Sequence, residues 1–346
     1  MNGCVVVSTT MSQPTLVIHG GAGNIRRSNV SKEVEASYRE GLKDALLVGH
    51  RELEATDSAL KAVAAAVKCM EDNPIFNAGK GAVFTRRGHN ELEASVMVSK
   101  GEEKKAAAVS LLKHVKNPID LARLLLQYPE NPHVLNSGDE AERMAEKFGC
   151  EMVSPDYFFT PLRWKQHEDG LNSKPTLSED MNSAGKEWVP KGTIGATALD
   201  SSGTIAVGTS TGGLTNKTDG RIGDTPQAGA GFWAEEFEQP SLIRRMFFMK
   251  PKKAAVGLSG TGDGEGFLRN AICHSITERV KYTGSSLKQS AKLQLQNTKT
   301  QAGVVGIDES GNVVMAMNCG MNRGFIGPDG IPHTAIFQDE SPKARL

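Results

Sequence analysis

Short apolar runs and helical stripes of apolar side chains alternate in the first part of the chain. Residues 15–19 contain three consecutive branched apolar residues, which predicts a short buried strand that ends at the glycine-rich stretch 20–23. Apolar side chains recur at helical spacing after Ser31, and a second such stripe follows the capping-type residues 56–58. We therefore expect one strand followed by two amphipathic helices.

Two more strands and two more helices are expected before the middle of the chain. Residues 91–98 and 106–112 have the composition of strands. A leucine-rich helix is expected over 119–127, because the preceding Asn-Pro pair places a capping residue before a proline in the first turn. Another helix over 139–148 ends at Gly149, a residue type that favours the C-terminal cap.

A polar segment then interrupts the pattern. From about residue 165 to residue 191 the chain is rich in Ser, Asn, Glu, Lys and Gly, with hardly an apolar period. A long structureless stretch inside a compact domain is often functional or disordered. Immediately after it, a clean strand over 193–200, a turn over 201–203 and a return strand over 204–210 are expected.

A similar hairpin is expected near the C-terminus. It comprises strands over 303–308 and 313–317, joined by a turn at 309–312. Between the two hairpins lie an apolar strand over 254–259 and a helix over roughly 265–280. This order of elements favours an α+β fold with sheets sandwiched by helices, rather than a regular parallel βαβ series.

The chain carries no excess of charge. Lys plus Arg is 40 and Asp plus Glu is 40, so the formal net charge is zero over 346 residues. Nucleic-acid binding and polybasic membrane anchoring both need a basic excess. We therefore expect no nucleic-acid or membrane partner and favour a small-molecule substrate.

The cysteines and histidines indicate neither a disulfide framework nor a metal site. Five cysteines are widely spaced, odd in number and without a CxxC pair, and His89, His167 and His274 have no metal-ligand spacing. The valine run near the N-terminus is too short for a signal-peptide core, and no apolar stretch approaches the length of a membrane span. We expect a cytoplasmic protein with idle thiols.

Glycine is concentrated in residues 192–231, which hold ten of the 37 glycines in forty positions. Such density lets backbone approach a ligand closely, although tight turns alone would also account for it. Within this stretch Arg221 and Asp224 stand three residues apart. Arg is a bidentate partner for a carboxylate and Asp a partner for an ammonium, so the pair suits a zwitterionic amino acid. A local surface salt bridge is the alternative.

Thr193 opens a strand directly after the polar segment. A threonine hydroxyl is a weak nucleophile unless a base lies beside it. If Thr193 were a free N-terminus, its own α-amino group, with an ordinary pKa of about 7.7–8.0, would be that base. An isolated threonine at this place would otherwise reflect β-propensity alone.

Several segments together resemble the plant-type asparaginase and isoaspartyl peptidase family. They are LVIHGGAG (16–23), FNAGKGAVFT (76–85), ELEASVM (91–97), GTIGATALD (192–200), TSTGGLTNKTDGRIGDTP (209–226) and GTGDGEGFLR (260–269). They follow the family's order and span nearly the whole chain. The resemblance implies a four-layer αββα sandwich of the N-terminal-nucleophile hydrolase type, which hydrolyses L-asparagine and β-aspartyl dipeptides to release L-aspartate.

The resemblance also implies the residues of the active site. Thr193 would be the nucleophile, freed by self-cleavage of the Gly192–Thr193 bond, and Thr211 would bond its amine or hydroxyl. Thr261 and the Gly262 backbone would form the oxyanion hole, a device typically worth a few kcal/mol.

Substrate recognition is implied for a second group of residues. Arg221 would bind the α-carboxylate and Asp224 the α-ammonium, and Asn77 would have a lesser positioning role near the nucleophile. The floor of the pocket would be completed by Gly223, Asp263 and Gly264.

The resemblance further implies how the chain is organised. An α subunit, 1–192, would end in a flexible linker over about 165–192, and a β subunit, 193–346, would begin with the nucleophile. Both would form one folded domain, and two processed αβ units a homodimer. No cofactor is expected, although in relatives the loop around Met70–Lys80 binds sodium through backbone carbonyls.

Two departures from the family pattern keep an alternative open. The usual GTGE reads Gly260-Thr261-Gly262-Asp263-Gly264-Glu265 here, which leans toward glycosylasparaginase, and Lys191 precedes the cleavage glycine. A non-enzymatic scaffold that binds an amino acid is a third hypothesis, and a phosphate-binding loop at 19–23 is disfavoured by its spacing.

We interpret His19 as a structural loop residue, because Thr193 would supply its own base.

Overall fold

Two β-sheets pack face to face in the computed structural model, which describes residues 13–101, 105–172, 192–239 and 252–342. Among these residues, the larger sheet has the strand order β12-β11-β1-β5-β6-β2-β3-β4 and the smaller sheet the order β10-β9-β8-β7. The strands are β1 (Thr15–Gly23), β2 (Leu92–Val98), β3 (Ala106–Leu112), β4 (Leu135–Ser137), β5 (Ile194–Leu199), β6 (Ile205–Thr211), β7 (Phe232–Gln239), β8 (Lys252–Gly262), β9 (Ala302–Asp308), β10 (Val313–Met317), β11 (Gly320–Ile326) and β12 (Pro332–Ala335).

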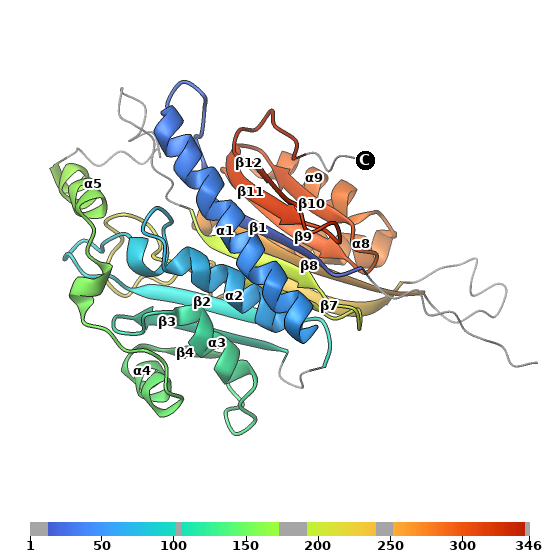
Figure 1. Ribbon diagram of the computed structural model, residues 1–346, viewed down its shortest axis with the longest axis horizontal. Helices are drawn as coiled ribbons and strands as arrows, with labels where there is room; N and C mark the ends of the chain where they lie inside the picture. Colours follow the sequence, from blue (N-terminus) through green and yellow to red (C-terminus); the bar gives the residue numbers. More distant parts are fainter. Residues whose placement is uncertain (1–12, 102–104, 173–191, 240–251, 343–346) are drawn as a thin grey trace, which may run out of the picture.

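Helices cover the outer faces of both sheets (Figure 1). Three of them, α1, α2 and α3, contact strands of the larger sheet, whereas α8 and α9 contact the smaller one. The helices are α1 (Lys32–Thr56), α2 (Ala59–Glu71), η1 (Gly79–Gly81), α3 (Pro118–Leu126), α4 (Gly138–Lys147), η2 (Pro155–Phe158), α5 (Pro161–Asn172), α7 (Gly264–Asn270), α8 (Ile272–Thr283) and α9 (Leu287–Asn297).

The strands pair antiparallel throughout the described chain except for β3 with β4. This pairing confirms the expected α+β class and excludes a parallel βαβ series. On their inner faces β1, β5 and β6 of the larger sheet contact β8 of the smaller. The expected hairpin that follows Thr193 therefore forms the middle of the larger sheet, next to β1.

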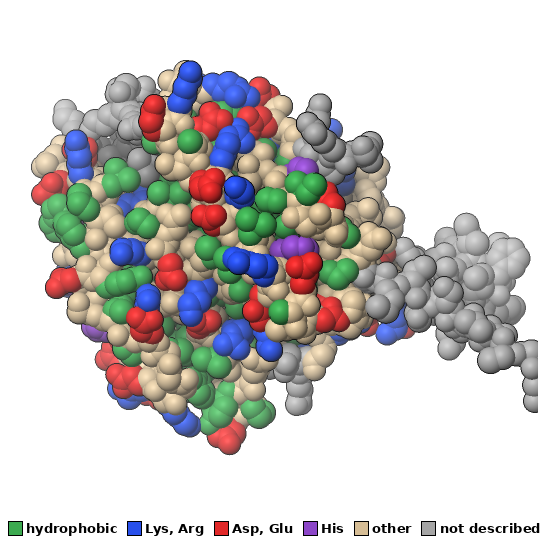
Figure 2. Space-filling view, in the orientation of Figure 1, with side chains coloured by type: hydrophobic (Ala, Val, Ile, Leu, Met, Phe, Trp, Pro, Cys, Tyr) green, Lys and Arg blue, Asp and Glu red, His purple; other side chains and the backbone are tan. Residues whose placement is uncertain are grey.

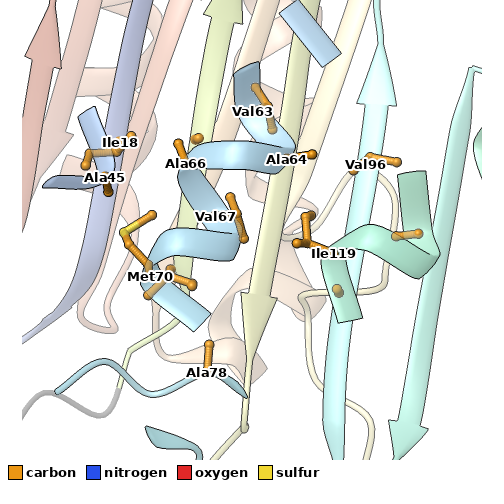
Figure 3. Close-up of a cluster of buried hydrophobic side chains, with 14 of the residues drawn as sticks. Ile18, Ala45, Val63, Ala64, Ala66, Val67, Met70, Ala78, Val96 and Ile119 are labelled. Carbon is orange, nitrogen blue, oxygen red and sulfur yellow. The ribbon is translucent and has the colours of Figure 1, made fainter. Parts of the chain in front are cut away.

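Helix α2 packs on the larger sheet because its inner face is made of small and branched apolar residues. Ser58 caps the helix by accepting a hydrogen bond from the Lys61 amide. Val63, Val67 and Met70 then face the sheet and are fully buried (Figure 3). Frequent alanines let the helix approach the strands closely, and α2 therefore packs tightly against β5 and β6.

The expectation of a structureless segment from residue 165 is wrong for its first eight residues, which belong to α5. This helix is held by polar and aromatic contacts: Arg163 is fully buried and donates to the Gly81 carbonyl at 2.7 Å, and Trp164 packs edge-on against Phe84. The expectation depended on the spacing of aliphatic residues, and this spacing does not reveal a helix that is held by a buried arginine and a tryptophan. Residues 173–191 lie outside the described part of the chain.

The single helix expected over 265–280 is two helices. Ala271 separates them with a left-handed φ of 42°, which breaks the helical hydrogen bonding. Helix α9 was not expected, although Ser286 and Gln289 at its start form a capping box. Strands β7, β11 and β12 were missed as well, and the glycine-rich stretch 20–23 belongs to β1.

Acidic and basic side chains are interspersed on the face of the molecule shown in Figure 2. No patch of a single sign dominates that view, in keeping with the balanced composition. In the described ranges no helix is both long and apolar enough to cross a membrane.

Candidate active site

Thr193 lies immediately before β5, in the middle of the larger sheet. The register pairs Ile194 with Ser210, so one step further along both strands Thr193 stands opposite Thr211. The Thr193 side chain is buried, and its hydroxyl is 3.3 Å from that of Thr225. Thr225 was not singled out from the sequence, although it directly follows Asp224.

Gly192 is packed against two separate elements. A Cβ at this position would lie 2.6 Å from the Thr261 hydroxyl of β8 and 2.6 Å from the Ala22 amide nitrogen of β1. Contacts this short are essentially never seen for a real Cβ. Only glycine therefore fits before Thr193, and the Gly192–Thr193 peptide passes directly beside the Thr261 side chain.

Thr261 has a hydroxyl that makes no hydrogen bond within the described residues, although its side chain is fully buried. An unsatisfied buried hydroxyl is unfavourable, so such a group is often kept for a ligand or a reaction intermediate. The next residue, Gly262, has φ of +134°, which other residues rarely adopt. Thr261 and Gly262 end β8 beside the Gly192–Thr193 peptide.

Asn77 connects the loop after α2 to the end of β6. Its amide nitrogen donates to the Gly213 carbonyl at 2.8 Å, and its side-chain oxygen accepts from the Val83 amide at 3.0 Å. The Thr211 hydroxyl in turn accepts from the Gly213 amide at 3.0 Å. Asn77 thus holds the backbone that follows Thr211.

Arg221 and Asp224 do not pair with each other in the described chain. The Arg221 guanidinium instead forms an ion pair with Glu265 of α7 at 2.9 Å, a partner that the sequence analysis did not single out. The alternative of a local Arg221–Asp224 salt bridge is therefore wrong.

Asp224 is buried, and the backbone of Gly264 closely approaches its carboxylate. A Cβ on Gly264 would lie 2.5 Å from Asp224 Oδ1 and 3.1 Å from Arg221 Nη2, which brings both side chains to the same glycine. Burial raises the pKa of Asp224 to about 7, assisted by the negative charges of Glu93 and Asp263. Arg221 acts in the opposite direction, since a nearby cation favours the ionised form of a buried carboxyl group.

Asp263 caps α7 rather than facing outward. Its carboxylate accepts a hydrogen bond from the Glu265 amide at 3.2 Å, and its backbone amide donates to the Gln301 carbonyl at 2.8 Å. The departure from the family pattern at this position is thereby accommodated as a helix cap.

Gly223 is fixed by a buried acid that the sequence analysis missed. Its amide donates to Glu93 Oε1 at 2.9 Å, across from β2. Glu93 is one of two acidic residues in the quoted ELEASVM segment, and its place within a run of apolar residues is the only signal for it in the sequence.

His19 belongs to β1 rather than to a loop, which corrects its expected location. Its Nε2 is 2.7 Å from the Ser259 hydroxyl of β8, and both side chains are fully buried. Burial lowers the pKa of His19 to about 3, against a smaller effect of the Thr193 backbone. His19 is therefore neutral near pH 7 and links the two sheets next to β5.

The chain is similar to known proteins over most of its length. A family model described as "Asparaginase" matches residues 12–240 and 251–336. The chain is similar to the isoaspartyl peptidase of Escherichia coli, 37% identical over 335 residues that cover 95% of this chain and 98% of that protein. It is also similar to an isoaspartyl peptidase/L-asparaginase of Xenopus laevis (32%, covering 95% and 97%) and a plant-type L-asparaginase of Pyrococcus horikoshii (34%, covering 88% and 92%).

Proposed function

Because the chain belongs to the asparaginase family, we propose that it is a threonine-nucleophile hydrolase that releases L-aspartate from L-asparagine and β-aspartyl dipeptides. The observation that carries the proposal is the position of Gly192 and Thr193. The bond between them lies against Thr261, whose buried hydroxyl has no partner in the described chain. A nucleophile and an oxyanion donor thus meet at one peptide bond.

Self-cleavage is the first reaction of the proposed site. The Thr193 hydroxyl attacks the Gly192 carbonyl carbon, the C–N bond to Thr193 breaks, and the resulting ester is hydrolysed by water. The products are a Gly192 carboxylate and a free Thr193 amine. Contact with the Thr225 hydroxyl orients Thr193 Oγ1 for the attack.

Substrate hydrolysis uses the amine that self-cleavage releases. With an ordinary pKa of about 7.7–8.0, the Thr193 amine accepts the hydroxyl proton as Oγ1 attacks the β-carbonyl of an aspartyl unit. Thr261 Oγ1 and the Gly262 amide stabilise the oxyanion. The protonated Thr193 amine gives its proton to the leaving group, which is ammonia from L-asparagine or the second amino acid of a β-aspartyl dipeptide. Water then hydrolyses the β-aspartyl ester to L-aspartate.

The two charged side chains hold the aspartyl unit in place. Arg221 binds the α-carboxylate and Asp224 the α-ammonium, with the backbones of Gly223 and Gly264 between them. Asn77 positions the β6 end through Gly213. Because the clamp recognises only α-groups, it leaves the β-carbonyl substituent as the variable part of the substrate.

The proposed specificity is tested by comparing three substrates on the fully processed enzyme at one pH. We expect measurable kcat/KM for L-asparagine and a β-aspartyl dipeptide and little for N-acetylglucosaminyl-asparagine. A tenfold preference for the sugar-linked substrate, about 1.4 kcal/mol of transition-state stabilisation, would replace the proposal by the glycosylasparaginase alternative. Absence of turnover on all three would favour the binding scaffold.

The processed molecule is proposed to be a four-layer αββα sandwich of subunits 1–192 and 193–346. The contacts of α1–α3 and of α8–α9 with opposite sheets support this arrangement. We further propose a homodimer of processed units in the cytoplasm. The thiols of Cys69, Cys150 and Cys273, none of them in a disulfide, support a reducing compartment.

We propose no cofactor for the reaction and at most a structural sodium ion in the loop 70–80. In this loop the carbonyls of Asn73 and Ala78 accept backbone hydrogen bonds, and each retains a second lone pair. Carbonyl oxygens are suitable donors for a hard cation. No group of three or more His, Cys, Asp or Glu side chains in the described ranges could hold a metal ion.

A further inference from the structure

Glu93 of β2 is a fully buried acid next to the proposed clamp. Oε1 accepts a hydrogen bond from the Gly223 amide at 2.9 Å, whereas Oε2 has no hydrogen-bond partner in the described part of the chain. A Cβ on Gly223 would lie 3.2 Å from Glu93 Oε2 and 2.7 Å from Arg221 Nη1. Glu93 and Arg221 therefore meet at Gly223.

The charges around Glu93 come from three directions. Glu91 lies two residues away, just before β2, and its Oε2 accepts a hydrogen bond from the Gly220 amide at 2.9 Å. The glycine-rich loop contributes Lys217, Asp219, Arg221 and Asp224, and the end of β8 with α7 contributes Asp263 and Glu265. Lys217 is buried and donates to the Glu91 carbonyl at 2.7 Å.

Burial raises the pKa of Glu93 as well as that of Asp224, but Glu93 has more neighbouring groups that favour its ionised form. Glu93 faces two cations, Lys217 and Arg221, and accepts an amide hydrogen bond. Asp224 is favoured by Arg221 but faces the carboxylates of Glu93 and Asp263. Two buried carboxylates at close range do not both ionise readily without a further cation.

We propose that Glu93 is a positioning residue of the substrate clamp, which holds the turn of Arg221 and Asp224 by the Gly223 amide and makes Asp224 depend on the substrate ammonium for its charge. This inference rests on the proposed role of Arg221 and Asp224. It explains why a carboxylate is buried on a central strand without touching the nucleophile. Burial is the main cause of the raised pKa of Asp224, the carboxylate of Glu93 raises it further, and a bound α-ammonium lowers it again.

The test separates free enzyme from the substrate complex. Asp224 titrates in kcat/KM, which reports the free enzyme, but not in kcat, because the bound ammonium keeps it ionised. Glu93→Gln preserves an acceptor for the Gly223 amide and removes the charge. We expect its acid limb of kcat/KM to move to lower pH by about half a unit or more, with the pH profile of kcat unchanged.

Glu91→Gln is the matched control, since it replaces a buried acid just before the same strand and retains an acceptor for the same loop. We expect its profiles to match the wild type. An unchanged acid limb in Glu93→Gln, or an equal shift in Glu91→Gln, would overturn the inference. A general structural defect would lower kcat and self-processing together, without a selective shift in kcat/KM.

Glu93→Asp gives an independent result if the Gln variant does not fold. It keeps the charge but withdraws the carboxylate from the Gly223 amide by one methylene, so we expect KM to rise about tenfold or more without a shift of the acid limb. A wild-type KM would overturn the positioning role. If Arg221→Ala and Asp224→Ala also retain wild-type kcat/KM, the proposed substrate clamp is wrong. If these two variants lose activity while the Glu93 variants behave like the wild type, the clamp stands and only the role proposed for Glu93 is wrong.

Discussion

Arg221 pairs with Glu265 and not with Asp224 in the described chain, and we expect substitution of either Arg221 or Asp224 to impair substrate binding but not self-cleavage. We expect Arg221→Ala and Asp224→Ala each to lose about 2 kcal/mol or more of transition-state stabilisation, because each substitution leaves one charge of the substrate unpaired. Self-cleavage uses no amino-acid clamp, so both variants should still be processed. Near-normal kcat/KM for both substrate classes in either variant would remove that residue from the site.

Asp224 also predicts how activity depends on pH. Its pKa is raised to about 7, so it is ionised above that pH and loses its charge, and its hold on the ammonium, as pH falls through it. The Thr193 amine must be neutral as well, and therefore kcat/KM should fall toward low pH with a limiting logarithmic slope of about two. Asp224→Asn should reduce that slope to about one. A slope of two in the variant would contradict the assignment.

A second buried acid joins two helices and a strand at the element scale. Glu71, at the end of α2, accepts hydrogen bonds from the Ser210 hydroxyl of β6 at 2.6 Å and from the Ile119 amide of α3 at 3.1 Å. Burial raises the pKa of Glu71 to about 8, despite these hydrogen bonds. The folded chain therefore binds a proton that the unfolded chain releases above about pH 4.5.

The sign of this linkage gives a stability prediction. Since the folded state binds more protons than the unfolded state between pH 4.5 and about 8, the contribution of Glu71 to stability falls as pH rises through that window. Glu71→Gln imitates the protonated acid, so its Tm should be close to the wild type at pH 5 and higher at pH 8.5. Equal pH dependence of Tm in both proteins would contradict the buried-acid description.

The start of β5 is a sterically constrained element. Because a Cβ at Gly192 would overlap Thr261 and the Ala22 amide, Gly192→Ala must displace the scissile peptide, at a cost of about 1–3 kcal/mol. We expect self-cleavage to slow by about tenfold or more, as measured by the fraction of uncut chain with time. Gly327→Ala, where the space is open apart from Asp329 at 3.7 Å, is the matched control and should be processed at the wild-type rate.

The elements that could be predicted from the sequence were those with aliphatic periodicity and explicit caps. The stripe after Ser58 became α2, and the hairpin after Thr193 became β5 and β6. Helix α5 was missed because its anchor is the guanidinium of Arg163, and the single helix over 265–280 was wrong because Ala271 breaks it. Neither a buried arginine nor an alanine in the left-handed conformation changes the spacing of apolar residues from which the helices were predicted.

At the scale of the whole molecule, sequence motifs named the residues but not their partners. Thr193 and Thr211 were expected near each other, and the β5–β6 register places them in opposite positions. The pairing of Arg221 with Glu265 and the hold of Glu93 on Gly223 depend on contacts between segments far apart in the chain. Contacts between charged groups far apart in the sequence leave no local pattern, so they could not be predicted without the arrangement of the two sheets.

The central claim is that Thr193 cuts its own chain and then serves as the catalytic nucleophile. Purified wild-type protein, incubated without added protease, should give fragments 1–192 and 193–346 by denaturing gel and intact mass. Thr193→Ser retains a hydroxyl and should also be cut, whereas Thr193→Ala should remain a single chain without activity on L-asparagine. Cleavage of Thr193→Ala at the same bond would contradict the account.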